Sequence, residues 1–359
     1  MEPAIRSKAA TARNLLLVAI STALTLASVE ILMRLTLDPS DLYSSFHNRP
    51  DLNQWRNEVQ FWERYHDAPS ADFGSYDPLL GWDNLSGGDR IRGGLEELDT
   101  TGLRILAVGD SFVWGNEVAA DETFSSVLNA RFSDLQVLNM GVPGYGIDQA
   151  YLKYLHYGSP LAPDVILFGV YVSDYERASV AFSTYSKPRF KAIGDQFVLE
   201  NQPVAAPDLE LDRIGAALEG RWYLVEFIHN AWRRLATGAD QDRRFFDQTD
   251  RIIAHILGSL QRSLSPDQKL LVVHIPRGES FTETEPFFDE MHRSLLAIYA
   301  SLGLDYIDLF QAYRVRLSAA EAAARYYVQR PSGSVGHLSA AGHARVAELI
   351  AEHLGIDAR

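Results

Sequence analysis

The stretch Ile105-Leu-Ala-Val-Gly-Asp-Ser111-Phe-Val-Trp-Gly115 decides the fold. It opens with an apolar run of strand length, and the Gly-Asp-Ser that follows predicts a turn into a loop and then a helix. A serine at such a turn is exposed at the carboxyl edge of a buried sheet, where its backbone N–H can point toward a developing oxyanion. The stretch therefore predicts a buried strand that ends in a nucleophile, Ser111.

The same alternation of apolar runs and amphipathic stretches continues along the chain. Strands are predicted at 103–108, 135–140, 164–170, 269–275 and 304–308, and helices at 121–132, 147–157, 245–264, 284–302 and 339–354. Buried strands that alternate with helices form a parallel sheet covered on both faces. We therefore expect a three-layer α/β/α, flavodoxin-like sandwich with a five-stranded parallel sheet, whose site lies at the carboxyl ends of the strands.

An insertion at about 178–244 interrupts this rhythm. Residues 189–202 alternate around Gly194-Asp195, which predicts a hairpin, and residues 221–235 form an aromatic-rich amphipathic stretch. An insertion after a sheet strand lies where a lid would lie. A structural cap without a role in substrate binding fits the sequence equally well.

The N-terminus differs from the rest of the chain. Residues 14–37 contain a nearly continuous apolar run from Leu15 to Met33, broken mainly by four small hydroxyl residues and Glu30. Roughly 20 such residues suffice for a membrane-spanning helix. Arg6, Lys8 and Arg13 precede this stretch while only Arg34 follows it closely, so residues 1–13 are expected in the cytoplasm and the remainder in the periplasm. The chain is thus expected to be a single-pass protein of the cell membrane. A cleaved signal peptide is the alternative, although the apolar run continues past any small-residue cleavage site.

The remaining composition narrows the function. Residues 38–100 are polar and turn-rich with scattered aromatics, which indicates a stalk that packs partly on a main domain at 101–359. The net charge of −14 argues against nucleic acid as a partner, and the absence of cysteine excludes disulfides, thiolate zinc sites and a cysteine nucleophile. No group of His, Asp and Glu has the spacing of metal ligands, so neither a metal nor another cofactor is expected.

A serine nucleophile needs a histidine base. His337 is placed best, since it stands after the last predicted strand and before the final helix, where the chain returns to the edge that carries Ser111. His274 ends a predicted strand and is the alternative base. His343 falls in the first turns of the final helix and is expected to be a packing or surface residue.

Four segments together resemble the SGNH (GDSL-type) hydrolases, over about residues 103 to 355. They are Gly109-Asp110-Ser111-Phe112, Asn139-Met-Gly141-Val-Pro-Gly144, Ser173-Asp174 and His337-Leu-Ser-x-x-Gly-His343, in the order of the family. The apolar helix with Glu30 and Arg34, the Leu80-Gly81-Trp82 segment and the hairpin region from Pro188 to Pro203 are similar to bacterial membrane-anchored members.

The resemblance implies a role for each residue. Ser111 would be the nucleophile and His337 the base. The N–H groups of Ser111 and Gly144, together with Ser173, would form the oxyanion hole. Four further residues are expected to support the site. Asp110 would tie the nucleophile turn together, and Asn139 and Gly141 would shape the loop that carries them. Asp174 is the fourth.

Two positions depart from the family pattern. The third segment usually carries an asparagine whose amide completes the oxyanion hole, and this chain has Ser173 there. The last segment usually carries an aspartate two or three residues before the histidine, and this chain has Ser334-Val-Gly there. The imidazole could be oriented instead by a backbone carbonyl, by the Ser334 hydroxyl or by a carboxylate from elsewhere such as Asp308, and the sequence does not choose among them.

The leading hypothesis is a membrane-anchored ester hydrolase that acts through an acyl-serine on O-acyl esters, with an envelope polysaccharide or a lipid as the acyl carrier. An O-acyltransferase using the same serine is the nearest alternative, because only the acceptor, water or a sugar hydroxyl, differs. A non-catalytic binding or assembly protein on a degenerate SGNH fold is the third.

Overall fold

The central sheet of the computed structural model has five parallel strands. The structure describes residues 2–37, 50–67, 76–83, 102–236, 238–315 and 317–356. The strands are β3 (Leu103–Val108), β4 (Leu135–Asn139), β5 (Val165–Tyr171), β8 (Lys269–Ile275) and β9 (Asp305–Asp308), in the order β4-β3-β5-β8-β9. The predicted fold class is confirmed, and each strand boundary lies within one residue of its prediction.

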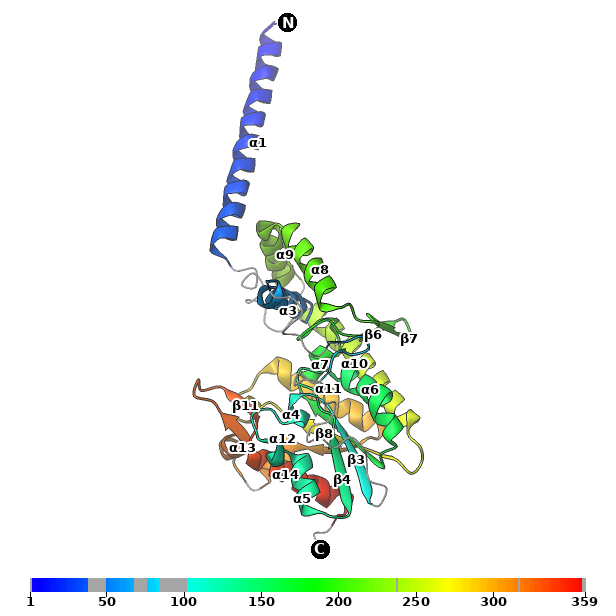
Figure 1. Ribbon diagram of the computed structural model, residues 1–359. Helices are drawn as coiled ribbons and strands as arrows, with labels where there is room; N and C mark the ends of the chain where they lie inside the picture. Colours follow the sequence, from blue (N-terminus) through cyan, green and yellow to red (C-terminus); the bar gives the residue numbers. More distant parts are fainter. Residues whose placement is uncertain are drawn as a thin grey trace.

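Helices cover both faces of this sheet (Figure 1). Successive side chains of a strand point to opposite faces, so Leu106 and Val108 of β3 enter one core and Ile105 and Ala107 enter the other. The first core includes residues of α6 (Ile147–Lys153), α10 (Gly238–Ser263) and α11 (Pro286–Leu302). The second includes residues of α5 (Phe124–Arg131) and α14 (Ala340–Leu354).

Several short elements were not predicted. The helices α12 (Leu309–Arg314) and α13 (Ala319–Tyr326) lead into a hairpin of β10 (Tyr327–Gln329) and β11 (Val335–Leu338). His337 therefore lies on a short strand that was not predicted, between the last strand of the sheet and the final helix. A run of four residues is too short for a strand periodicity to be visible in the sequence.

The N-terminal helix α1 spans Glu2–Thr36. It therefore includes most of residues 1–13, the segment that is expected in the cytoplasm. Ala9, Ala10 and Ala12 favour the helix there, since alanine has the highest helix propensity. Its part from Arg13 to Thr36 is long and apolar enough to cross a membrane, by length and composition. Figure 1 shows α1 extending away from the sheet.

The region between α1 and the sheet packs on the main domain in its described parts. Trp55 and Phe61 of α3 (Pro50–Tyr65) are buried in the first core, and Trp82 is buried at the end of the small hairpin of β1 (Tyr76–Asp77) and β2 (Gly81–Trp82). The rest of the predicted stalk, at 38–49, 68–75 and 84–100, lies outside the described residues.

The insertion begins after α7 (Asp174–Arg177). It contains the predicted hairpin as β6 (Arg189–Ile193) and β7 (Gln196–Glu200), followed by α8 (Pro207–Glu219) and α9 (Tyr223–Ala236). Lys187 connects it to α6 by a buried ion pair with Asp148. In Figure 1, α8 and α9 lie between α1 and the sheet.

Candidate active site

Ser111 begins a short helix, α4 (Ser111–Trp114), directly after β3. Asp110 caps this helix, because its Oδ1 accepts a hydrogen bond of 2.9 Å from the Phe112 N–H. Ser111 is only 7% exposed. The cap fixes the turn and holds the hydroxyl at the carboxyl edge of the sheet, as the sequence predicts, but the serine is buried there and not exposed as expected.

The His337 side chain lies against Ser111. Its Nε2 is 2.9 Å from the Ser111 Oγ, although the two residues are 226 positions apart. The Phe112 ring supports the imidazole with a centroid separation of 4.7 Å and is itself stacked on Tyr171 at 4.3 Å. The pair has the geometry in which an imidazole can accept a proton from a serine hydroxyl.

Glu117 completes a chain of three side chains. Its Oε2 is 2.6 Å from His337 Nδ1 and also accepts a hydrogen bond of 2.8 Å from the His337 backbone N–H. Arg330, near the turn of the β10–β11 hairpin, donates to both carboxylate oxygens at 2.8 and 2.9 Å. The pKa of Glu117 is lowered to about 2, mainly by the hydrogen bonds from the Arg330 guanidinium and further by those from His337. The carboxylate therefore stays ionised at neutral pH.

Glu117 is the functional residue that the sequence analysis missed. It lies six positions after Ser111, with a left-handed backbone (φ +68°). A Cβ added at Gly336 would lie 2.6 Å from the Glu117 Oε2, so the glycine before His337 leaves room for this carboxylate. An acidic residue in the turn that follows the nucleophile helix was the available signal, because that turn returns to the same edge of the sheet.

The other candidates for orienting or replacing His337 lie elsewhere. Asp308 caps α12 by accepting a hydrogen bond from the Phe310 N–H, and the Ser334 hydroxyl lies 2.8 Å from the Ser332 hydroxyl. His274 is fully buried, 2.8 Å from His292 through its Nε2, and burial lowers its pKa to about 3. His343 is a packing residue, as expected: it is fully buried and its Nδ1 accepts a hydrogen bond from the Phe124 N–H.

The loop after β4 lies beside the nucleophile helix. Asn139 donates from Nδ2 to the Val113 carbonyl at 2.6 Å, and its Oδ1 accepts from the Gly141 N–H at 3.0 Å. A Cβ added at Gly141 would lie 2.4 Å from the Trp114 nitrogen, so the loop and the helix pack closely. Asn139 and Gly141 thus fix this loop.

Gly144 has a left-handed backbone (φ +85°), and the Thr184 hydroxyl covers it. A Cβ at this position would lie 2.4 Å from the Thr184 Oγ1. Trp82 supports the same loop, since its Nε1 donates to the Pro143 carbonyl at 3.0 Å and its own carbonyl accepts from the Tyr145 hydroxyl at 2.6 Å. Two segments outside the central sheet, β2 and the start of the insertion, therefore shape the loop that carries Gly144.

Backbone N–H groups are available for an oxyanion. Within the part of the chain that the structure describes, neither the Ser111 N–H nor the Gly144 N–H donates a hydrogen bond to another protein group. Ser173 stands directly after the carboxyl end of β5, the strand beside β3, and begins α7 as its N-cap residue.

Arg177 joins the two buried acids of the site. Its Nη1 donates to Asp174 at 2.7 Å, to Asp110 at 3.3 Å and to the Tyr145 carbonyl at 3.1 Å. Asp174 also accepts from the Tyr171 N–H at 3.0 Å. Burial raises the pKa of both carboxyl groups, and the nearby Asp110 raises that of Asp174 further. One guanidinium thus holds the nucleophile turn, the Gly144 loop and α7 together.

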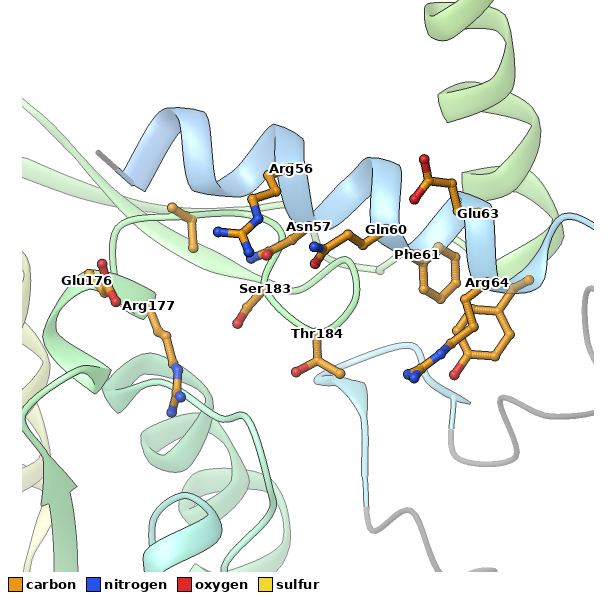
Figure 2. A pocket seen from close by; sticks show the side chains of 12 residues that line it. Arg56, Asn57, Gln60, Phe61, Glu63, Arg64, Glu176, Arg177, Ser183 and Thr184 are labelled. Carbon is orange, nitrogen blue, oxygen red and sulfur yellow. The ribbon is translucent and has the colours of Figure 1, made fainter. Parts of the chain in front are cut away.

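A polar cleft of about 870 Å³ lies between α3 and the segment 176–184 at the start of the insertion. Figure 2 shows α3 along one side of the cleft, with Arg177 and Thr184 opposite. Its wall also contains the following charged and amide side chains: Arg56, Asn57, Gln60, Glu63, Arg64 and Glu176. Two residues connect the cleft to the surroundings of Ser111: Arg177, which contacts Asp110, and Thr184, which covers Gly144.

The chain is similar to solved structures of ester hydrolases. One is an α/β hydrolase enzyme from the metagenome of Lake Arreo, at 14% identity and TM-score 0.40, covering 71% of this chain and 96% of that chain. Another is a member of the lipolytic G-D-S-L family from Veillonella parvula, at 13% identity and TM-score 0.38, covering 69% and 96%. A third is an acetylxylan esterase from Geobacillus stearothermophilus, at 14% identity and TM-score 0.40, covering 72% and 96%.

The five-stranded parallel sheet with helices on both faces is the architecture that the SGNH resemblance implies. No protein-family model matches the chain, and no curated protein does. Identities of this size describe a fold, and many activities share one fold. The chemistry must therefore be inferred from the side chains around Ser111.

Proposed function

We propose that the protein is a serine ester hydrolase in which Ser111, His337 and Glu117 form the catalytic triad. The observation that carries this proposal is the unbroken series of contacts, 2.9 Å from Ser111 Oγ to His337 Nε2 and 2.6 Å from His337 Nδ1 to Glu117 Oε2. A carboxylate on Nδ1 orients the imidazole and stabilises the imidazolium that forms during catalysis.

The reaction proceeds in two halves. The Ser111 Oγ attacks the ester carbonyl while His337 Nε2 takes the hydroxyl proton, and that proton then passes to the leaving alcohol as the C–O bond breaks. Water attacks the resulting acyl-serine with His337 again as base, which releases the acid and restores the serine. The N–H groups of Ser111 and Gly144 hold the oxyanion, with Ser173 as a third donor.

The cleft suggests the kind of alcohol that carries the acyl group. Guanidinium, amide, hydroxyl and carboxylate groups line it, and these groups hydrogen-bond polyhydroxylated ligands. An O-acylated carbohydrate of the cell envelope is therefore the proposed substrate, with α1 as a membrane anchor and the hydrolase domain in the periplasm.

The same cleft favours O-acyl transfer as the second candidate function. An acceptor sugar bound beside Ser111 could attack the acyl-serine in place of water. Mass spectrometry after incubation with an acyl donor and an oligosaccharide would detect acylated sugar if transfer occurs.

The test of the proposal is labelling of the full-length protein in detergent by a serine-directed fluorophosphonate, beside hydrolysis of short-chain model esters. The wild type should be labelled and active, and Ser111→Ala should be neither. Ser186→Ala is the matched control, since Ser186 is a buried serine whose hydroxyl contacts Asn201 and no residue of the triad. A folded wild type that takes no label would favour the non-catalytic binding or assembly protein.

A further inference from the structure

Helix α9 carries an apolar face that the rest of the described chain does not cover. Val225, Phe227, Ile228 and Trp232 lie along one side of this helix, and each is more than half exposed. Glu226 and His229 lie on the opposite side, which makes the helix amphipathic. A contiguous exposed apolar face of this kind marks an interaction surface.

The membrane-spanning candidate α1 is attached to the start of this helix. The Glu30 carboxylate accepts hydrogen bonds from the N–H groups of Tyr223 and Leu224, at 3.0 and 2.8 Å, and so caps α9 from a distant part of the chain. Arg34 binds Glu30 at 2.7 Å, donates to the Arg221 carbonyl and lies over the Tyr223 ring. Glu30 is 6% exposed. The junction therefore fixes the position of α9 along α1.

The position of Glu30 sets the depth of α9. The apolar span has 24 residues, and at ~1.5 Å per residue it is ~36 Å long. The hydrocarbon core of a bilayer is ~30 Å thick. Glu30 lies six residues before the end of α1, which is ~9 Å along the helix axis. A span centred in the core extends ~3 Å beyond it at each end, so the start of α9 lies ~6 Å inside the boundary between hydrocarbon and headgroups.

The residue types of α9 fit that boundary. Tryptophan and tyrosine are enriched at membrane interfaces, where the ring lies among the headgroups. Trp222, Tyr223 and Trp232 stand at the start and along the length of the helix, with aliphatic residues between them. Amphipathic helices with this arrangement lie in the plane of the interface with the apolar face in the acyl chains.

We propose that α9 lies in the interface of the membrane that α1 spans, with its apolar face inserted into the lipid of the periplasmic leaflet. The inference rests on the proposed anchoring by α1 and adds a second contact with the bilayer. Two contacts joined at Glu30 would hold the hydrolase domain in one orientation, and a single spanning helix would not. The cleft on α3 would then be held close to the membrane surface.

The absence of cysteine makes the test direct. Single cysteines at Ile228 and Trp232 of the full-length chain carry a nitroxide, and the protein is placed in lipid nanodiscs at one copy per disc. Relaxation of the label by oxygen, which concentrates in lipid, is compared with relaxation by a water-soluble nickel complex. His229→Cys is the matched control on the polar side of the same helix. Leu24→Cys, which is exposed on α1, reports the spanning helix.

The expected result is that the labels at Ile228 and Trp232 are relaxed more by oxygen than by nickel, as at Leu24, while the label at His229 shows the reverse. If Ile228 and Trp232 behave like His229 while Leu24 remains in lipid, the inference fails, and the apolar face instead serves a protein partner or a second copy. If Leu24 is also accessible to nickel, the proposed anchor fails. One copy per disc prevents self-association from imitating insertion.

Discussion

Glu117 Oε2 lies 2.6 Å from His337 Nδ1, across 220 positions of sequence. The carboxylate comes from the turn after the nucleophile helix and not from the segment before the histidine. The first prediction follows from this contact. Glu117→Gln should reduce kcat for ester hydrolysis roughly 10³–10⁴-fold, because an amide stabilises the imidazolium less and permits the wrong tautomer.

The control for this variant is Asp308→Asn, which changes the carboxylate that caps α12 and leaves the triad intact. It should retain nearly all activity. Both rates are measured with the same model ester and compared with Ser111→Ala. An active Glu117→Gln protein beside an inactive Asp308→Asn protein would exclude Glu117 as the third member.

The second prediction concerns acid stability. Folding lowers the pKa of Glu117 from 4.5 to about 2, chiefly through Arg330. A carboxylate with a depressed pKa stabilises the fold above its ordinary pKa, and this stabilisation is lost as the pH falls through the folded value. Between pH 4.5 and pH 2 the wild type should therefore lose more stability than Glu117→Gln does. Thermal unfolding at a series of pH values measures the difference, and parallel curves for the two proteins would contradict the prediction.

How much of this site was predictable differs between its parts. Ser111 and His337 could be predicted as candidates because each stands beside an element with a clear period, a buried strand or an amphipathic helix. Glu117 was not found, because its role depends on how the turn after α4 meets the β10–β11 hairpin. Gly336 belongs to the same contact between the turn and the hairpin, since its lack of a side chain leaves space for the Glu117 carboxylate. In the sequence it is only a glycine beside a histidine.

The sheet was predictable for a different reason. Four of its strands are largely apolar runs, and burial on both faces makes such runs visible in one sequence. The edge strand β9 differs, because Asp305 and Tyr306 are exposed. The contacts that complete the site are between elements: Thr184 over Gly144, Trp82 on Pro143 and Arg177 on Asp110. No local pattern encodes contacts of this kind, so the sequence left the role of the insertion open between lid and cap.

The third prediction tests the close approach at Gly144. Gly144→Ala would place a Cβ 2.4 Å from the Thr184 Oγ1, at a backbone φ of +85°. Displacement of this loop would move the N–H proposed for the oxyanion hole, so kcat should fall roughly 10²–10³-fold. Gly194→Ala is the matched control, since it also has a positive φ (+59°) but nothing within 4 Å of the added methyl. It should lose about 1 kcal/mol of stability through the backbone and keep its activity.

The last prediction concerns the buried pair of Lys187 and Asp148, which attaches the start of the insertion to α6. Neither side chain is exposed, and Lys187 also donates to the carbonyls of Arg177, Val180 and Pro188 at 3.1 Å. Lys187→Met leaves Asp148 as a buried charge without its counterion. The free energy of unfolding should then fall by about 3–5 kcal/mol at neutral pH, whereas Lys191→Met in the exposed hairpin pair with Glu200 should cost less than about 1 kcal/mol.

The pH dependence of that loss identifies its cause. Burial raises the pKa of Asp148 and the nearby Lys187 lowers it, so removal of the lysine should raise the folded pKa further. A raised carboxyl pKa destabilises the fold above that pKa, and the cost disappears as the acid becomes protonated. The deficit of Lys187→Met, followed by urea unfolding, should therefore shrink as the pH is lowered, and Asp148→Asn in the same background should remove much of it at neutral pH. A deficit that is independent of pH would indicate lost packing around the lysine stem and not a buried charge.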